Sequence, residues 1–118
     1  MNSEFAENLR EVFAEFGPIE IKSMFGCFGI FRDGLMFALV EDDVLYLKAD
    51  KRTAASFEDR GLPSFEYEKG GKKVGMSYFQ APEEIFDERE VAKEWADLAF
   101  GAALRGQSAK TTSGRKGK

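Results

Sequence analysis

The segment between residues 24 and 48 constrains the fold most, because it alternates short apolar runs with tight polar turns. Asp33-Gly34 can adopt the positive φ angles that a two-residue hairpin loop requires. Glu41-Asp42-Asp43 is a polar break between two further apolar runs, which favours a second hairpin. Strands joined by such short turns must be antiparallel. The segment therefore predicts an antiparallel sheet.

Three other stretches show the spacing of helices. In residues 4–16 the apolar side chains recur on one face and the acidic ones on the other. Residues 51–60 predict a short helix that Asp50 can cap. Residues 87–104 predict the main helix, with small and apolar residues along one stripe.

The remaining apolar stretches predict strands. Residues 19–31 predict one long strand that is bent or bulged at Gly26 and Gly29. Residues 64–69 and 72–80 predict a hairpin. The order is then helix, three strands, helix, two strands, helix. With the helices on one sheet face, this is a two-layer α+β domain with an antiparallel sheet.

Length and composition predict one domain followed by a short tail. A chain of 118 residues with 12 Phe can form a single core. We expect this domain to span residues 1–105. Residues 106–118 contain no large apolar side chain to bury, so we expect a disordered basic tail there.

The missing residue types exclude several classes of enzyme. The chain has no histidine and one cysteine, Cys27. Histidine is the general base of Ser-His-Asp and Cys-His catalysis and a common zinc ligand. A single cysteine allows neither an internal disulfide nor a Cys-rich zinc site. We therefore expect a protein that is not an enzyme and that needs no cofactor or metal.

Charge is divided unevenly along the chain. All 21 acidic residues lie in residues 1–97 beside 12 of the 17 basic ones, which gives this part a net charge of −9. Such a domain repels phosphate backbones, so we expect nucleic acid to bind at most weakly, through the basic residues that follow. These residues are Arg105, Lys110, Arg115, Lys116 and Lys118.

The sequence carries no signal for a membrane. No apolar run approaches the length of a membrane span, and the charged N-terminal residues do not resemble a signal peptide. We expect a cytoplasmic protein.

Two glycines and the cysteine near the start of the sheet have both a functional and a structural interpretation. Gly26 and Gly29 could belong to a phosphate-binding loop, but no Lys-Ser/Thr pair follows them and no helix is predicted to start there. Bends of a strand explain them better. Cys27 could be a redox thiol, but no nearby residue is expected to lower its pKa, so a small half-buried strand residue is favoured.

Two polar groups later in the chain also have two interpretations. Glu41-Asp42-Asp43 could bind a hard cation, yet three adjacent acids lack the spacing of a calcium loop, and a solvated turn is favoured. Ser77 with a nearby lysine could form a Ser-Lys dyad. Nothing in the sequence places such a lysine at hydrogen-bond distance, so we expect none.

Four short motifs follow one another in a fixed order. They are Met24-Phe25-Gly26 with Gly29, Asp33-Gly34 with Met36-Phe37, Leu45-Tyr46-Leu47-Lys48, and Met76-Ser77-Tyr78 followed by Pro82. As a set they resemble the N-terminal domain of the TfoX/Sxy competence regulators, over roughly residues 5–103. We interpret these motif residues as structural.

The resemblance implies a secretion-chaperone-like α+β fold and no catalytic residues. Two-domain members of that family resemble positive regulators of DNA-uptake genes that act with the cyclic-AMP receptor protein at a subset of its promoters. We expect this chain to be a stand-alone domain that lacks their second, helical domain, so their partner does not carry over to it.

The favoured function is that of a small non-enzymatic regulatory or protein-interaction domain. We expect it to dock another cytoplasmic protein, or a second copy of itself, through the sheet or an exposed strand edge. One alternative is a small-ligand binder or enzyme with a pocket between sheet and helix. The other is a nucleic-acid-associated protein that acts through the basic tail.

Overall fold

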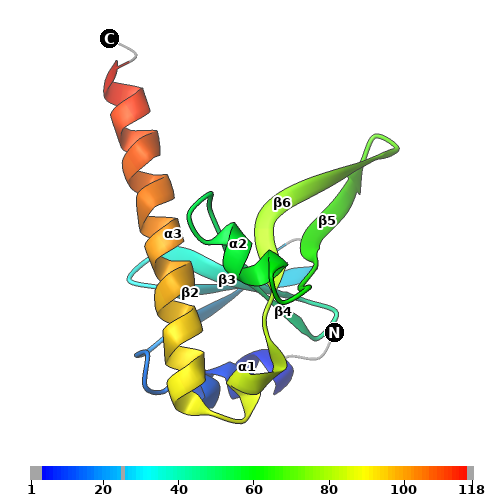
Figure 1. The fold of residues 1–118 in the computed structure, drawn as a ribbon, viewed down its shortest axis with the longest axis vertical. Helices are drawn as coiled ribbons and strands as arrows, with labels where there is room; N and C mark the ends of the chain where they lie inside the picture. Colours follow the sequence, from blue (N-terminus) through cyan, green and yellow to red (C-terminus); the bar gives the residue numbers. More distant parts are fainter. Residues whose placement is uncertain (1–3, 25, 117–118) are drawn as a thin grey trace.

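A computed structural model describes residues 4–24 and 26–116, and in this part of the chain three α-helices pack on one antiparallel sheet (Figure 1). The helical elements are α1 (Glu4–Val12), α2 (Ala54–Glu58), the short 3₁₀ helix η1 (Glu83–Phe86) and α3 (Arg89–Lys116). The strands are β1 (Glu20–Met24), β2 (Cys27–Arg32), β3 (Leu35–Glu41), β4 (Val44–Lys48), β5 (Ser64–Lys69) and β6 (Lys72–Gln80). None of the described helices is both long and apolar enough to cross a membrane.

The sheet has the strand order β1-β2-β3-β4-β6-β5, and every neighbouring pair is antiparallel. The main core lies between this sheet and the helices. Phe37 of β3 is fully buried there, with ring centroids 5.7 Å from Phe13, 5.0 Å from Phe16 and 6.1 Å from Phe100. The predicted two-layer α+β fold is confirmed.

The hairpin turns have the backbone that their residues predict. Asp33 and Gly34 have φ angles of 53° and 78°, and Gly70 and Gly71 have 60° and 82°. Two consecutive positive φ angles match the right-handed twist of the joined strands. In the acidic turn Asp42 and Asp43 adopt the same conformation without a glycine, with φ angles of 55° and 60°.

One predicted strand is in fact two. Residues 19–31 form the hairpin of β1 and β2, whose register pairs Met24 with Cys27 and Lys22 with Gly29. Gly26, with φ of 83°, lies in the turn between the strands, while the register shift of β2 falls between Ile30 and Phe31. The sheet therefore has six strands where the sequence predicted five. The prediction failed because the apolar pattern continues through this turn, with no polar residue to mark it.

The helix boundaries also differ from those predicted. The first helix ends at Val12, and residues 13–16 continue as turns that still bury Phe13 and Phe16. The second helix is limited to Ala54–Glu58. The last helix continues to Lys116, well past the end predicted at residue 104, and its final turns extend beyond the sheet (Figure 1). Whether residues 106–118 separate from the domain as a disordered tail stays a prediction.

Candidate interaction surface

The sheet face away from the helices, here called the helix-free face, carries its own small apolar cluster. Leu39, Phe65 and Tyr78 are buried in it, and Met36 and Tyr46 pack against them. All five belong to strands, whereas the side chains of the helices contribute to the larger core on the other face. The rings of Tyr46 and Phe65 are 4.9 Å apart and meet edge to face. Because Met36 and Tyr46 are only half-buried, this face offers aromatic and thioether surface to a partner.

The pairing of strands β4 and β6 places the ammonium group of Lys48 at the end of this cluster. The register pairs Lys48 with Tyr78. Lys48 Nζ donates a hydrogen bond to Ser77 Oγ at 2.8 Å and lies 5.2 Å from the centroid of the Tyr78 ring. The expectation that no lysine lies at hydrogen-bond distance from Ser77 is therefore wrong, because only the β4–β6 pairing brings these two residues together across 29 positions of sequence.

The geometry of the Lys48–Ser77 pair favours binding over catalysis. Lysines that act as bases are usually buried, because burial favours the neutral amine. Here Ser77 is exposed and Lys48 is only half-buried. Burial raises the pKa of Tyr78 to about 12, so its phenol stays protonated and is no base at neutral pH. What the pair presents is an ammonium group beside a hydroxyl group, which suits a hydrogen-bond acceptor on a partner.

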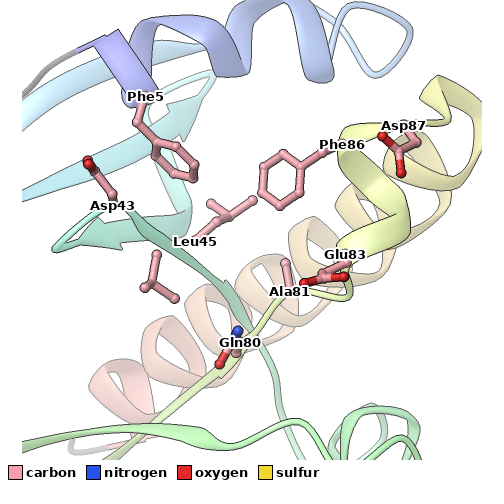
Figure 2. Close-up of a pocket in the computed structure, with 9 residues that line it drawn as sticks. Phe5, Asp43, Leu45, Gln80, Ala81, Glu83, Phe86 and Asp87 are labelled. Carbon is pink, nitrogen blue, oxygen red and sulfur yellow. The ribbon is translucent and has the colours of Figure 1, made fainter.

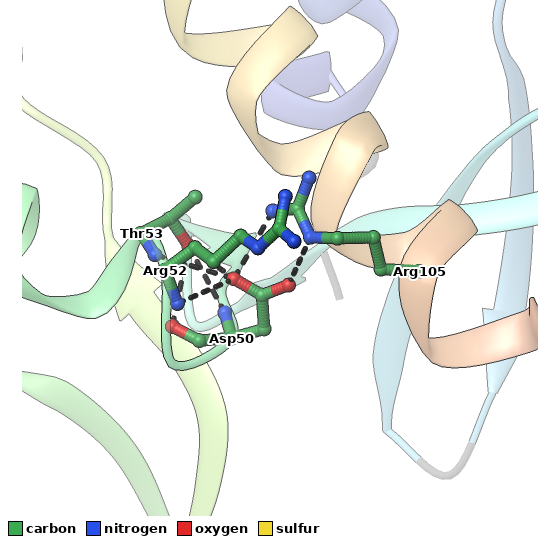
Figure 3. A network of polar contacts seen from close by, with 4 residues as sticks. All are labelled: Asp50, Arg52, Thr53 and Arg105. Carbon is green, nitrogen blue, oxygen red and sulfur yellow. Dashed lines mark hydrogen bonds and ion pairs between the residues drawn. The ribbon is translucent and has the colours of Figure 1, made fainter. Parts of the chain in front are cut away.

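A second polar group fastens α3 to the end of β4 (Figure 3). Asp50 accepts hydrogen bonds from Arg105 Nε at 2.6 Å and Nη2 at 3.1 Å, and from the backbone N–H groups of Arg52 and Thr53 at 3.0 and 3.2 Å. The hydrogen bonds from Arg105 lower the pKa of Asp50 most, and the positive charge of Arg105 and the two backbone N–H groups lower it further, to about 2. Asp50 thus organises the turn before α2, but the N-cap of that helix is Thr53 and not Asp50 as predicted. Arg105, which was counted among the basic residues available to nucleic acid, is paired with Asp50.

Two hollows lie beside these polar groups. One has a volume of about 410 Å³ and is lined by Lys48, Asp50, Ser77 and Phe79, with Ala102 and Gly106 from α3. The other has a volume of about 540 Å³ and is lined by Met36, Lys48 and Tyr78, with residues near the end of the packed part of α3. Lys48 lines both hollows, and it is the one basic residue of the four motifs.

The motif residues divide between the two sheet faces. Phe37, Leu45 and Leu47 are buried in the helix-side core, whereas Met36, Tyr46, Lys48 and Tyr78 belong to the helix-free face. Pro82 is buried just before η1, and Gly29 is buried within β2. Met24 and Met76 lie on β1 and β6, and Phe25 lies outside the described residues. The structural interpretation of the motif residues stays a prediction, since some are buried in the helix-side core and others lie half-exposed on the helix-free face.

Two other candidates from the sequence, Cys27 and the acidic turn at residues 41–43, show no sign of a functional site. Burial, and secondarily the charge of Glu41, raises the pKa of the Cys27 thiol, which is the opposite of what a reactive cysteine needs. Glu41, Asp42 and Asp43 are exposed at the β3–β4 turn.

Comparisons with known proteins match one family over most of the chain. The model of the TfoX N-terminal domain family matches residues 11–103. Protein Sxy of Escherichia coli (strain K12) is 28% identical over 106 residues, which cover 90% of this chain and 51% of Sxy. DNA transformation protein TfoX1 of Aliivibrio fischeri (strain ATCC 700601 / ES114) is 30% identical over 87 residues, which cover 74% of this chain and 41% of TfoX1. The chain spans about half the length of the curated relatives that it matches.

Proposed function

Because the chain belongs to the TfoX N-terminal domain family, we propose that it is a non-enzymatic regulatory domain that docks another protein through its helix-free face. The observation that carries this proposal is the contact of Lys48 with Ser77 and Tyr78 at the end of a half-exposed aromatic cluster. These residues come from two motifs far apart in the sequence.

The composition of this face supports a docking role. Tyr and Met side chains are enriched in the buried centres of protein interfaces, and an outer rim of polar groups is typical of them. Met36 and Tyr46 supply such a centre, while Lys48 and Ser77 supply polar groups at its border. A partner that covers Lys48 would need a carboxylate or carbonyl oxygen at that point.

The names of the relatives suggest where such a domain acts. TfoX1 is named as a DNA transformation protein. We infer that this chain takes part in the cytoplasmic regulation of DNA uptake, through contact with a protein.

The proposal is tested by capturing partners with three forms of the chain in parallel from the native host. Lys48→Glu reverses the charge on the helix-free face, and Lys93→Glu makes the same change on the exposed outer side of α3. We expect a protein that the wild type and Lys93→Glu retain and that Lys48→Glu loses. Equal recovery by both variants would contradict docking at this face.

A second candidate function has its own observation. Lys48, Ser77 and Asp50 line the same hollow of about 410 Å³, a volume within the range of small-molecule sites. A small anionic ligand held by Lys48 is the alternative that this geometry favours. A thermal-shift screen of metabolites tests it: a shift that Lys48→Ala abolishes, without any protein partner, would replace docking by ligand binding.

A further inference from the structure

A third hollow, of about 350 Å³, lies at the other end of the domain, where α1, β4 and η1 meet. Phe5 and Phe86 form its walls, with ring centroids 5.8 Å apart, and Figure 2 shows the two rings pointing toward each other above Leu45. Phe86 is 39% exposed, which makes it one of two large apolar side chains of the described part that lie open to solvent.

Three carboxylates surround these rings. Asp43 lies beyond Phe5 at the β3–β4 turn, while Glu83 and Asp87 lie on the side of η1 (Figure 2). All three are exposed, and none forms an ion pair with another described residue, whereas six other acids of the same part do. The hollow therefore combines uncompensated negative charge with aromatic faces.

This combination selects a cationic side chain. An ammonium or guanidinium group gains from carboxylates and from the faces of aromatic rings, and its apolar stem can cover the rings. An anion would be repelled by the carboxylates and by the ring faces, and a purely apolar group would gain only from the rings. An arginine or lysine side chain therefore suits the site best.

The described part of the basic segment, residues 106–116, lies at the opposite end of the molecule from the hollow. Residues 106–118 carry Lys110, Arg115, Lys116 and Lys118 and no acid, while residues 1–97 carry a net charge of −9. The long helix α3 begins beside η1 and ends far from it (Figure 1). Its 28 residues correspond to a length of about 42 Å at 1.5 Å per residue. As part of that helix, the basic segment points away from the hollow of its own copy.

We propose that the hollow between Phe5 and Phe86 binds the basic C-terminal segment of a second copy of this chain. A contact between two different surfaces is heterologous, so the association is head to tail and not a closed two-fold dimer. Its strength rests on exposed charges and falls as salt rises. The site is separate from the helix-free face, so its test stands independently of the proposed function.

The first test measures binding of a fluorescent peptide of residues 106–118 to the full chain by anisotropy. Neutralising Asp43, Glu83 and Asp87 together (to Asn, Gln and Asn) is expected to weaken binding about tenfold, from the loss of three exposed charge contacts. Phe86→Ala is expected to weaken it about threefold through the lost aromatic face. The control neutralises three exposed acids elsewhere, Glu15, Glu58 and Glu66 to Gln, with the same change in net charge.

The second test follows the weight-average sedimentation coefficient of the full chain against concentration. We expect it to rise with concentration at low salt for the wild type and the control, and to stay constant for the hollow variant. A wild type that remains a monomer throughout would overturn the proposal. So would peptide binding that the control weakens as much as the hollow variant does, or an unrelated arginine-rich peptide that binds where the chain's own segment does not.

Discussion

The two faces of the sheet are built from alternating residues of the same strands, yet they differ in what covers them. On β3, Phe37 is buried against Phe13, Phe16 and Phe100, while its neighbour Met36 remains half-exposed on the other side. On β4, Leu47 is buried under the helices, while Tyr46 and Lys48 lie on the helix-free face. Each of these two strands thus contributes to the core and to the exposed surface, because neighbouring side chains of a pleated strand point to opposite faces of the sheet.

The comparison separates residues that hold the fold from residues that are free to bind. The helix-side core contains most of the buried apolar side chains and must supply most of the stability. The helix-free face has a smaller cluster and keeps aromatic, thioether and ammonium groups accessible. Substitutions in the helix-side core should therefore lower the stability of the domain, whereas substitutions on the helix-free face should weaken binding of a partner.

The largest expected effect is on the helix side. Phe37→Ala should cost about 3–5 kcal/mol of unfolding free energy, the usual range for emptying a fully buried Phe site. Met36→Ala, one position away on the other face, should cost about 1 kcal/mol, because half of that side chain already contacts water. Urea denaturation of both variants measures the difference. Equal losses would mean that the two faces are equally covered.

The next effect concerns the ion pair that fastens α3 across the end of the sheet. The pKa of Asp50, lowered to about 2, corresponds to a stabilisation that is complete above about pH 4 and is lost as pH falls toward 2. After screening by solvent we expect it to contribute about 1 kcal/mol. Urea denaturation between pH 7 and pH 2 should show this loss in the wild type and not in Asp50→Asn.

Asp97→Asn is the control for that experiment, since it removes an exposed pair with Lys93 four residues earlier in the chain. It should change stability by less than about 0.5 kcal/mol at any pH. A wild type whose pH profile matches that of Asp50→Asn would show that Arg105 does not hold the carboxyl.

A smaller effect on stability is expected at the border of the helix-free face. Lys48→Ala and Ser77→Ala each remove one end of a solvent-accessible hydrogen bond, which should change the free energy of unfolding by less than about 0.5 kcal/mol. Thermal denaturation measures this directly. A loss of more than about 2 kcal/mol of unfolding free energy would show that the pair stabilises the fold.

The smallest effect is expected for the segment beyond the packed part of α3. Deleting residues 107–118 should leave the melting midpoint unchanged, because these residues supply no large apolar side chain to bury. Any nucleic-acid affinity should be weak, independent of sequence and lost with the deletion. With Arg105 paired to Asp50, four basic residues limit the salt dependence to a slope of about −3.6 on duplex DNA. Selective binding that survives the deletion would contradict this view.

The sequence predicted those parts of the fold that local chemistry determines. Asp33-Gly34 and Gly70-Gly71 fixed their hairpins because few residue pairs accept two positive φ angles. The burial of Phe37 followed from its place in an apolar run. The turn at Gly26 was missed, because an apolar pattern runs through it and a strand can tolerate a glycine.

The candidate site was harder to predict, because it depends on which strands are neighbours. Alternation alone places Tyr46 and Lys48 on one face, but only the pairing of β4 with β6 brings Ser77 to Lys48. The Asp50–Arg105 pair likewise joins two positions 55 residues apart. Such contacts follow from the order of strands and the path of α3, neither of which is contained in a local pattern.

Site-specific photo-cross-linking in the native host can show whether the helix-free face is the docking surface. A photoreactive phenylalanine analogue replaces Tyr46 on that face in one strain, and Glu94 on the exposed side of α3 in another. We expect a discrete protein adduct from position 46 and none from position 94. Adducts of equal yield from both positions, or an adduct from position 94 alone, would contradict this expectation.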